Sequence, residues 1–437
     1  MAIFNLHSIK IAHNKSTAGC IPKRMPVPES VVIPVSMHIG APAVPVVKAG
    51  DTVKTGQLIA SSGGYVSSPV YASISGKVKK IDDILLAGGN TVPAIVIESD
   101  GSNDIYSEIK APVINSFEDF IKAVADSGVV GMGGAGFPTH VKLNVKDLSK
   151  IEFVIINCAE CEAYITSDTR TMLDMTDEFF DGLSIIKQHI GDKRFIIGIE
   201  DNKKECIEKL KPYCASSGVE LKVLPSTYPT GGEKVLVYKT TGRVIPEGKL
   251  PLDAGAVVLN CTTVVALQKY IRTGMPIVEK TVTVAGSAVK EPQNVIVPIG
   301  TRVKDLIEFC GGYKEEPKKI LYGGPMMGIS MPDDSCPVLK NTNAILAFNA
   351  KDATPPKQTE CINCGRCVSH CPMNLMPAYI ATAYAAKDAK RLEQLKVNIC
   401  MECGCCSYVC PAKRPLVQTN KLSKALLKNY QMGAAKK

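Results

Sequence analysis

Two runs of four closely spaced cysteines near the C-terminal end constrain this 437-residue chain more than any other feature. The runs read CINCGRCVSHCP (361–372) and CMECGCCSYVCP (400–411), so each follows the pattern C-x-x-C-x-x-C-x-x-x-C-P. By this spacing thiolates hold [4Fe–4S] clusters, and the fourth cysteine of each run binds the other cluster. The pattern predicts one cluster on Cys361, Cys364, Cys367 and Cys410, and a second on Cys400, Cys403, Cys406 and Cys371.

Zinc is the main alternative ligand for these thiolates. Zinc sites usually arise from separated C-x-x-C pairs and not from two triplets that are each closed by Cys-Pro, so the pattern favours iron–sulfur clusters. Disulfides fit less well, because nothing in the sequence points to secretion. Two neighbouring clusters transfer single electrons, and we therefore expect this chain to be at least an electron conduit.

The composition is that of a protein outside the membrane. Hydrophobic residues make up 45% and charged residues 21% of the chain, and no apolar run reaches the roughly 18 residues of a membrane span. His7, Lys10, His13 and Lys15 interrupt any apolar core of a signal peptide. The sequence therefore predicts a reducing cytoplasm, and the length suits three or four domains.

The net charge of +9 is concentrated toward the C-terminus, where no acidic residue follows Glu402. In that tail, Leu422, Ala425 and Leu426 are spaced as on one face of a helix. A basic amphipathic helix could bind an anionic membrane or an acidic partner, and a solvated tail is an equal alternative. Nucleic acid is disfavoured, since aromatic residues make up 5%, Trp is absent and no binding module is recognisable.

The first hundred residues read as β-structure. From 30 to 98, short runs rich in Val and Ile are broken by Gly and Pro. VKAGDTVKTGQLIA followed by SPVYASISGKV resembles the barrel-sandwich hammerhead of biotinyl and lipoyl carrier domains. Those carriers need a lysine at the hairpin, and residues 61–68 contain none, so we expect a scaffold without a swinging arm.

The middle of the chain alternates between strands and helices, which predicts a parallel α/β sheet. The expected strands are 153–157, 195–199 and 257–259, and the expected helices are 116–126, 175–190 and 203–213. Residues 280–298 then alternate as strands and 302–310 read as a helix, which is typical of a small ubiquitin-like β-grasp domain. A Pro-containing linker (352–357) precedes the cysteine runs, whose intervening segment 377–397 is Ala-rich and helical.

A glycine-rich loop, GMGGAGFPTHVKL (131–143), follows the first of these helices. Gly131, Gly133 and Gly136 satisfy G-x-G-x-x-G, but the dinucleotide fingerprint requires a preceding strand, so the motif alone is weak. Closely spaced glycines let backbone amides approach a ligand, and a following helix N-terminus favours a phosphate, to which Lys142 would add a charge. A tight loop that serves only packing is the alternative.

Four segments in the same order give a specific resemblance. The glycine loop looks like GRGGAGFPTGLKW of the NADH-binding subunit of respiratory complex I, and NCAECEAY (157–164) resembles that family's NADESEPG. YPTGGEKVL (228–236) resembles YICGEETAL, and LNCTTV (259–264) resembles NNVETL. With its hammerhead, β-grasp segment and two-cluster end, the whole chain is similar to the C subunit of the Rnf complex, a membrane ferredoxin:NAD oxidoreductase.

The resemblance implies a noncovalently bound FMN and a nicotinamide nucleotide. The residues that would hold FMN are Gly131, Gly133, Gly134, Gly136, Lys142, Asn157, Glu160, Tyr228, Gly232, Glu233, Asn260, Thr262 and Thr263. Phe137 and Glu162 match the residues that stack on and orient the nucleotide, and Lys249 lies near a basic contact of that family. Departures at Leu252, at 144–145 and at Lys234 concern the nucleotide more than the flavin. Cys158 and Cys161 form a C-x-x-C that we interpret as incidental, with a redox dithiol as the alternative.

Together these patterns predict a multidomain α/β and β chain. The expected parts are a barrel-sandwich domain (1–110), a Rossmann-like FMN and NADH domain (111–275), an SLBB-like β-grasp domain (276–350), an α-helical ferredoxin domain with two [4Fe–4S] clusters (351–420) and a basic tail (421–437).

The implied function is electron transfer between NAD(H) and ferredoxin-side carriers through FMN and the clusters, without an acid–base or nucleophilic residue. The implied partners are membrane subunits that couple the reaction to Na⁺ or H⁺ and a cluster-carrying ferredoxin-like subunit, at the cytoplasmic face of the cell membrane. A cobalamin reductase of bacterial microcompartments and a non-catalytic relay remain alternatives.

Overall fold

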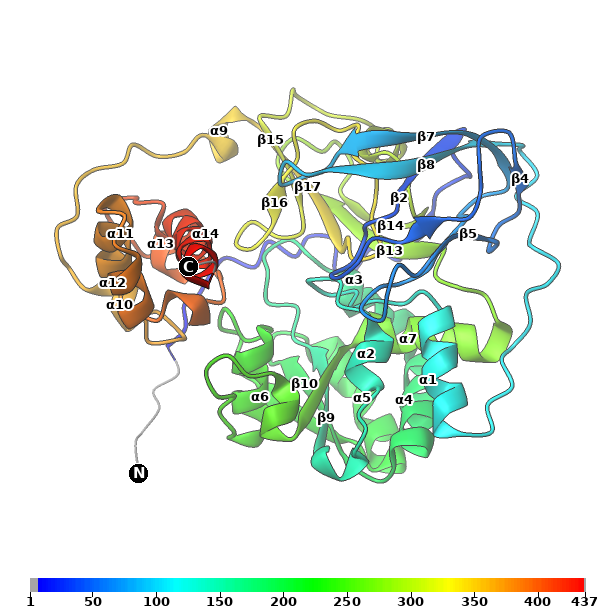
Figure 1. Cartoon of the computed structure of the whole chain (residues 1–437), viewed down its shortest axis with the longest axis horizontal. Helices are drawn as coiled ribbons and strands as arrows, with labels where there is room; N and C mark the ends of the chain where they lie inside the picture. The colour runs from blue at the N-terminus through cyan, green and yellow to red at the C-terminus, as the bar shows by residue number, and fades with distance from the viewer. Residues whose placement is uncertain (1–6, 436–437) are drawn as a thin grey trace.

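The computed structural model of the chain describes residues 7–435, whose strands form sheets of six, four, four and three strands. In Figure 1 the barrel-sandwich part and the β-grasp part lie together above the α/β part. The helical cysteine-rich part lies to one side, at the end of a long connection.

The barrel-sandwich part consists of a four-stranded sheet (order β2-β8-β7-β4) packed with a three-stranded sheet (β3-β5-β6). The strands are β2 (Ser30–Pro34), β3 (Val44–Pro45), β4 (Thr52–Val53), β5 (Leu58–Ser61), β6 (Val70–Tyr71), β7 (Gly76–Leu85) and β8 (Thr91–Ser99). Val31, Ile33, Ile59 and Ile95 are completely buried between the two sheets. The expected β-rich hammerhead is confirmed.

The described residues before this barrel follow a different course from the sequence prediction. Ile9 pairs with Tyr228 in an isolated antiparallel bridge, and β1 (Lys23–Arg24) joins the β-grasp sheet beside β14 (Gln293–Pro298). The ammonium group of Lys15 donates to the carbonyl oxygens of Glu160 and Glu162, at 2.8 and 2.7 Å. Residues 7–24 thus form an N-terminal strap across two other parts, while residues 1–6 lie outside the described residues.

The α/β part has a fully parallel sheet in the order β11-β10-β9-β12, as expected from the alternating pattern. The strands are β9 (Phe153–Cys158), β10 (Arg194–Glu200), β11 (Glu220–Leu224) and β12 (Ala256–Asn260). The helices are α1 (Phe117–Asp126), α2 (Thr139–Leu143), α3 (Ser167–Asp174), α4 (Thr176–Ile190), α5 (Lys204–Ser217), α6 (Glu233–Thr241) and α7 (Cys261–Thr273), with short 3₁₀ turns at Leu148–Lys150 and Pro251–Ala254. Figure 1 shows α4 and α5 on one side of this sheet and α6 on the other.

Two elements of the α/β part can be compared with what the sequence predicts for them. Ser116 accepts from the Asp119 backbone N–H and Asp119 accepts from that of Ser116, so a capping box begins α1 where the sequence indicated. The sequence does not predict β11, because its alternating residues ELKVL are half-exposed at the sheet edge and lack a buried apolar run.

The β-grasp part contributes one mixed sheet in the order β1-β14-β13-β17-β15-β16, and one helix, α8, packs on it. Besides β14, its elements are β13 (Glu279–Ala285), α8 (Val303–Phe309), β15 (Lys319–Tyr322), β16 (Ile329–Ser330) and β17 (Ala344–Phe348). Val282, Val295 and Ile345 are completely buried in its core. The predicted β-grasp architecture is confirmed.

Helices, most of them short, form the C-terminal part. After α9 (Ala350–Ala353) come α10 (Arg366–Ser369), α11 (Pro377–Ala385), α12 (Ala389–Gln394), a 3₁₀ turn (Val397–Ile399), α13 (Cys405–Tyr408) and α14 (Leu416–Ala435). Among residues 7–435, no helix is both long enough and apolar enough to cross a membrane.

The last helix, α14, differs from the predicted tail. It begins at Leu416, so the boundary expected between residues 420 and 421 falls inside it. The predicted apolar face was wrong: the Leu422 side chain is exposed (52%), and α14 instead buries Asn420, Ser423 and Leu427 against the rest of the domain. The tail therefore belongs to the helical part, except for residues 436–437, which lie outside the described residues.

Candidate functional site

The predicted flavin residues gather at the carboxyl edge of the parallel sheet. Asn157 near the end of β9 is the register partner of Asn260 at the end of β12. Ligands of open parallel sheets bind at this edge, outside the carboxyl ends of the strands. The glycine loop (131–136) crosses the same edge, because Met132 donates its backbone N–H to the Thr263 hydroxyl at 3.1 Å.

Three parts of the molecule hold the glycine loop. Within the loop, the Gly131 N–H donates to the Phe137 carbonyl at 2.9 Å. From the barrel, the Ile39 N–H donates to the Gly136 carbonyl at 3.2 Å. From the β-grasp part, the Asn341 amide donates to the Gly134 carbonyl at 2.9 Å. The loop is therefore a junction of all three parts and not a free surface turn.

A side chain would have space at one glycine of this loop and none at another. A Cβ on Gly133 would lie 2.6 Å from Asn260 Nδ2, whereas a Cβ on Gly134 would have no heavy atom within 4 Å. Gly136 has a φ of +69°, which a side chain disfavours. The loop thus packs closely on the α7 N-terminus and leaves its backbone open at Gly134, as a loop that receives a phosphate-bearing ligand requires.

Two further pairs complete this edge. The Lys142 ammonium donates to Glu233 at 2.8 Å and to the Val258 carbonyl at 3.3 Å. The Asn157 amide donates to the Gly231 carbonyl at 2.8 Å, which fixes the turn before α6. The structure therefore brings Lys142, Asn157 and Glu233 together with the glycine loop.

The N-terminus of α7 carries the predicted residues Asn260, Thr262 and Thr263, and it reveals a residue that the sequence did not indicate. Asn260 Oδ1 accepts from the backbone N–H groups of Thr262 and Thr263 at 3.0 and 3.3 Å. Asp168 in α3 accepts from Asn260 Nδ2 and from the Thr262 hydroxyl, both at 2.7 Å. Asp168 is buried, and no motif of the flavin segments contains it.

Glu160, predicted to reach the flavin, has protein partners on its carboxylate. Its carboxylate accepts from the Asp168 backbone N–H at 2.8 Å and from the Lys203 ammonium at 2.9 Å, with Lys15 at 3.9 Å. Burial raises the pKa of Glu160, but the two lysines outweigh burial and lower the pKa overall. Glu160 therefore caps α3 and balances buried cations, and its carboxylate is already bound by the protein.

Glu162 and Tyr228 point toward the cysteine-rich part. The Glu162 carboxylate accepts from the backbone N–H groups of Met326 and Met327 at 3.1 and 2.8 Å, in a loop of the β-grasp part. Burial raises the pKa of Glu162, and these two donors oppose the shift. The Tyr228 hydroxyl donates to the Cys403 carbonyl at 2.8 Å, so a flavin-segment residue contacts a cluster loop directly.

The remaining candidates differ in exposure. Phe137 is half-buried at the end of the glycine loop, Gly232 lies against the Met401 side chain, and Lys249 is exposed. Burial raises the pKa of Cys161 to about 12, which keeps a thiol protonated and unreactive at neutral pH. This favours the incidental interpretation of Cys158 and Cys161, both of which are buried free thiols.

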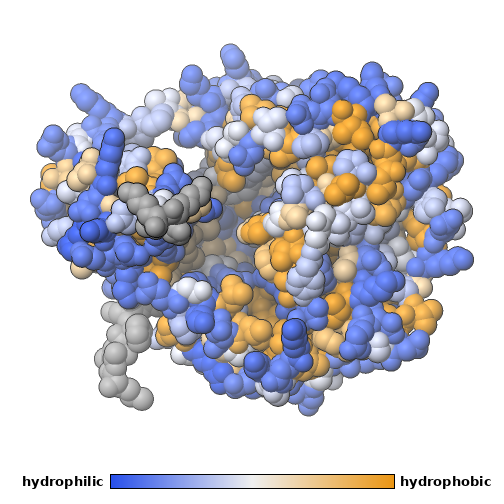
Figure 2. Space-filling view, viewed as in Figure 1, coloured by the Kyte–Doolittle hydropathy of each residue, from blue (hydrophilic) through white to orange (hydrophobic). Residues whose placement is uncertain are grey.

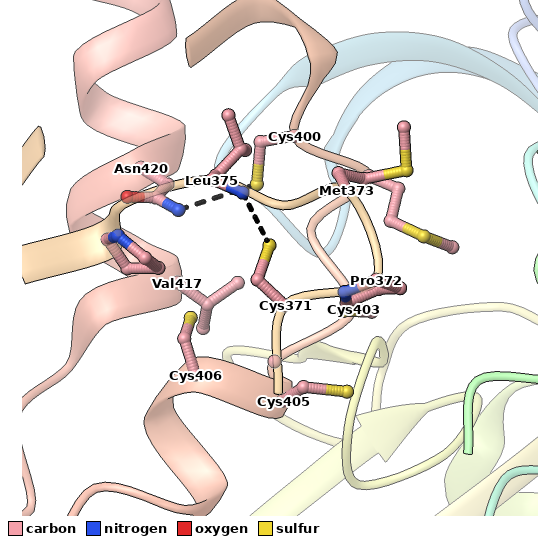
Figure 3. A pocket seen from close by; sticks show the side chains of 13 residues that line it. Cys371, Pro372, Met373, Leu375, Cys400, Cys403, Cys405, Cys406, Val417 and Asn420 are labelled. Carbon is pink, nitrogen blue, oxygen red and sulfur yellow. Dashed lines mark hydrogen bonds between the residues drawn. The ribbon is translucent and has the colours of Figure 1, made fainter. Parts of the chain in front are cut away.

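Two sulfur-lined cavities lie in the helical part. The inner cavity is narrow, with a volume of about 10 Å³, and is lined by Cys400, Cys403, Cys406 and Cys371, the second predicted tetrad, together with Cys405. Figure 3 shows the sulfurs of Cys371, Cys400 and Cys406 directed into a common space, while that of Cys405 points away. The Leu375 N–H and the Asn420 amide donate to the sulfurs of Cys371 and Cys400 at 3.3 and 3.4 Å. Such donors stabilise thiolates on a cluster.

The outer cavity has a volume of about 230 Å³ and is lined by Cys361, Cys364, Cys367 and Cys410, the first predicted tetrad. Cys361 and Cys364 are exposed, whereas Cys403 and Cys406 of the inner cavity are buried. Within residues 7–435, no three side chains of His, Cys, Asp or Glu lie close enough to hold one metal ion. The donor set is thus four thiols around each space, which fits a cluster more naturally than a single ion.

The comparisons with known proteins agree with this architecture. Family models match as the RnfC barrel sandwich hybrid domain (6–102), the Nuo51 FMN-binding domain (124–269), the SLBB domain (281–330) and a 4Fe-4S dicluster domain (360–413). The chain is 44% identical over 361 residues to the C subunit of the proton-translocating ferredoxin:NAD(+) oxidoreductase complex of Clostridium ljungdahlii, in a match that covers 82% of this chain and 79% of the relative. The chain belongs to the RnfC family.

Two further relatives extend this match. Identity is 42% with the C subunit of the Na(+)-translocating ferredoxin:NAD(+) oxidoreductase complex of Acetobacterium woodii, over 81% of each chain. It is 40% with the C subunit of the ion-translocating oxidoreductase complex of Rhodobacter capsulatus, over 96% of this chain and 82% of the relative. A chain of the NAD+-reducing [NiFe]-hydrogenase in its air-oxidized state shares the fold, with a TM-score of 0.52 at 17% identity. The match covers 74% of this chain and 64% of the hydrogenase chain.

Proposed function

We propose that this RnfC-family chain transfers electrons between NAD(H) and the carriers of a membrane-bound ferredoxin:NAD oxidoreductase complex, through FMN and two [4Fe–4S] clusters. The observation that carries this proposal is the contact between Tyr228 and Cys403, which joins the flavin segments to the inner cysteine tetrad. FMN, when bound, accepts two electrons together from a nicotinamide and passes them on singly. The protein supplies binding, orientation and electrostatics.

The chain's own residues divide the work of flavin binding. Open backbone at Gly134, together with the neighbouring Gly133 and Gly136, receives the phosphate and ribityl, and Lys142 adds positive charge held in place by Glu233. The pocket around the carboxyl ends of β9 and β12 is closed by Asn157, Tyr228, Gly232, Asn260, Thr262 and Thr263. Gly131 closes the loop itself through the Phe137 carbonyl. Glu160 supports the pocket indirectly, because its carboxylate binds the N-terminus of α3 and the buried lysines.

The proposed position of the nicotinamide nucleotide is beside the glycine loop. Phe137 is half-buried beside the loop and can stack on a ring, and Lys249 is exposed for a contact with a phosphate. Glu162 orients the nucleotide, and its two bonds to Met326 and Met327 give the carboxylate a fixed position before the nucleotide arrives.

The two tetrads differ in burial, which suits them to different neighbours. The inner tetrad lies beside Tyr228 and Met401 with three of its four cysteines buried, so it would hold the cluster next to the flavin residues. The outer tetrad exposes Cys361 and Cys364, so it would hold the cluster accessible to a partner. The fourth ligands, Cys371 and Cys410, cross between the runs and hold the two clusters close together.

The partners proposed are membrane subunits that couple the reaction to ion movement and a cluster-carrying ferredoxin-like subunit. The relatives' names specify proton or Na⁺ translocation. We assign ion movement to these membrane subunits. The proposed location is peripheral, at the cytoplasmic face of the cell membrane.

Rapid mixing of the anaerobically reconstituted chain with NADH tests this function. Flavin absorbance should bleach before the broad cluster absorbance, because only the flavin accepts hydride. A preparation with full FMN and both clusters that NADH does not reduce, or in which the clusters are reduced before the flavin, would refute the proposal. NADPH is the matched control, and it should react more slowly.

A further inference from the structure

One buried carboxylate stands directly behind the predicted flavin residues and is not explained by the family resemblance. Asp168 is the second residue of α3, and its two oxygens are divided between α7 residues: Oδ2 accepts from Asn260 Nδ2 and Oδ1 accepts from the Thr262 hydroxyl, both at 2.7 Å. Thr262 is also 3.0 Å from the Thr171 hydroxyl, one turn further along α3. Asp168 thus connects α3 to the first turn of α7.

This arrangement fixes the Asn260 amide in one orientation. Its oxygen caps α7 by accepting from the Thr262 and Thr263 N–H groups, so its nitrogen must face Asp168. The same nitrogen lies 2.6 Å from the position of a Cβ on Gly133, which makes it the side-chain atom nearest to the glycine loop there. A flipped amide would place an oxygen against the Asp168 carboxylate and remove the cap.

The helix cap alone does not require Asp168. Asn260 Oδ1 satisfies the two N–H groups of α7 by itself, and capping of this kind is common without a second carboxylate. Burying a carboxylate is costly, and among residues 7–435 Asp168 forms no ion pair that would offset the cost. What the carboxylate adds is the fixed direction of the Asn260 amide and the Thr262 hydroxyl, at the edge where the flavin is proposed to bind.

A buried lysine of the β-grasp part lies near this carboxylate without forming an ion pair with it. Lys280 in β13 donates to the Lys340 carbonyl at 3.0 Å and to the Met132 carbonyl of the glycine loop at 3.5 Å. Burial raises the pKa of Asp168, the nearby Glu160 raises it further and Lys280 lowers it. Burial lowers the pKa of Lys280 to about 7, and Asp168 opposes this shift. The β-grasp strand thus contacts the glycine loop through Lys280, on the loop that packs against Asn260.

We propose that Asp168 is a positioning residue of the flavin site, which acts on FMN only through Asn260 and Thr262. This inference rests on the proposed function, because it assumes that FMN binds at this edge. Asp168→Asn keeps the size of the side chain but leaves one acceptor oxygen, so the Thr262 hydroxyl must turn its proton away and accept from the new amide. We expect this variant to bind FMN at least tenfold more weakly than the unchanged chain, with both clusters retained.

A double-mutant cycle on the full chain tests how Asp168 acts. FMN dissociation constants are measured by flavin fluorescence for the unchanged apoprotein, Asp168→Asn, Asn260→Ala and the double variant. If Asp168 acts through Asn260 and Thr262, most of its effect disappears when Asn260 is already absent, so the two losses are strongly non-additive. Iron content and the thermal unfolding midpoint of each apoprotein show whether folding is intact.

Asp181→Asn is the matched control. Asp181 also binds α7, but it accepts from Gln268 and Arg272 in the C-terminal half of that helix. We expect Asp181→Asn to leave FMN binding unchanged. Equal losses of FMN affinity in Asp168→Asn and Asp181→Asn would mean that Asp168 only stabilises α7. Additive losses of FMN affinity in the cycle would mean that Asp168 acts independently of Asn260. Either result would overturn the inference. Failure of the unchanged chain to bind FMN would instead refute the proposed function.

Discussion

Replacing Gly133 by alanine is the sharpest test of the glycine loop as a flavin cradle. The new Cβ would lie 2.6 Å from Asn260 Nδ2 and 2.9 Å from Asn260 Cγ, closer than atoms of this kind approach each other. The Gly133 backbone is not in the left-handed region, so the conflict is one of space and not of backbone strain. Either the loop or the Asn260 amide must move, and Asp168 and the α7 cap resist movement of the amide.

The expected magnitude follows from the cost of overpacking. Forcing one methyl group into a well-packed contact costs about 1–3 kcal/mol. If the apoprotein relaxes by shifting the loop, FMN must restore the original position, and its dissociation constant rises by a factor of about 5 to 150. Flavin fluorescence titration of the apoprotein measures this factor, and thermal unfolding measures the cost without ligand.

Gly134→Ala provides the matched comparison within the same loop. A Cβ at Gly134 meets no heavy atom within 4 Å, so the apoprotein should unfold at the same temperature as the unchanged chain. Any loss of FMN affinity in this variant must come from the flavin itself. Unchanged unfolding and unchanged FMN binding in Gly133→Ala would show that the loop adapts freely and that the steric reasoning is wrong.

Three further predictions address the clusters, their link to the flavin part and pH. Cys371→Ala should remove the inner cluster and leave the outer one, so that iron falls from about eight to about four per chain while FMN stays bound; loss of the outer cluster instead would contradict the crossed ligands. Tyr228→Phe leaves the buried Cys403 carbonyl without its donor, and we expect an altered electron paramagnetic resonance spectrum of the inner cluster and slower transfer from flavin to cluster, with the outer-cluster spectrum unchanged. Burial lowers the pKa of Lys340 from 10.5 to about 7, so the unfolded chain binds more protons between these values and the unfolding free energy rises with pH across this range. Lys340→Met should remove up to about 1.4 kcal/mol per pH unit of that slope in denaturant titrations at pH 7 to 9; an identical slope in the variant would show that the lysine titrates normally.

The sequence is sufficient to predict the structure wherever it carries a local pattern. Buried strands such as FVIIN and FIIGI carry continuous apolar runs, and both lie in the parallel sheet as expected. The cysteine spacing likewise predicts which thiols share a cavity, because ligand geometry is encoded in short intervals. The strap at residues 7–24 could not be predicted, since its contacts lie more than 140 residues away and it has little regular structure.

Polar residues are harder to place than apolar ones. The family motif predicts that Glu160 faces the flavin, and the structure shows its carboxylate bound by Lys203 and by the α3 N-terminus. Asp168 stands eight residues later in a segment without a recognisable signal, yet it contacts two predicted flavin residues. In α14, the apolar character of Leu422 predicts a buried position, whereas the helix buries Asn420, whose amide donates to a cysteine sulfur. Hydrogen-bond partners, which the sequence does not show, decide these positions.

The contact between the flavin and cluster parts depends on residues from the whole length of the chain. Tyr228 touches Cys403 and is paired on its other side with Ile9 of the N-terminal strap. Met326 of the β-grasp part packs in the same apolar group, and its carbonyl lies against Gly404 beside the inner tetrad. Figure 2 shows a hollow between the cysteine-rich part and the main body on this face. Because Ile9 and Met326 share one apolar group with Tyr228 and Cys403, the strap and the Met326 loop support the contact through which the proposed electron path would run.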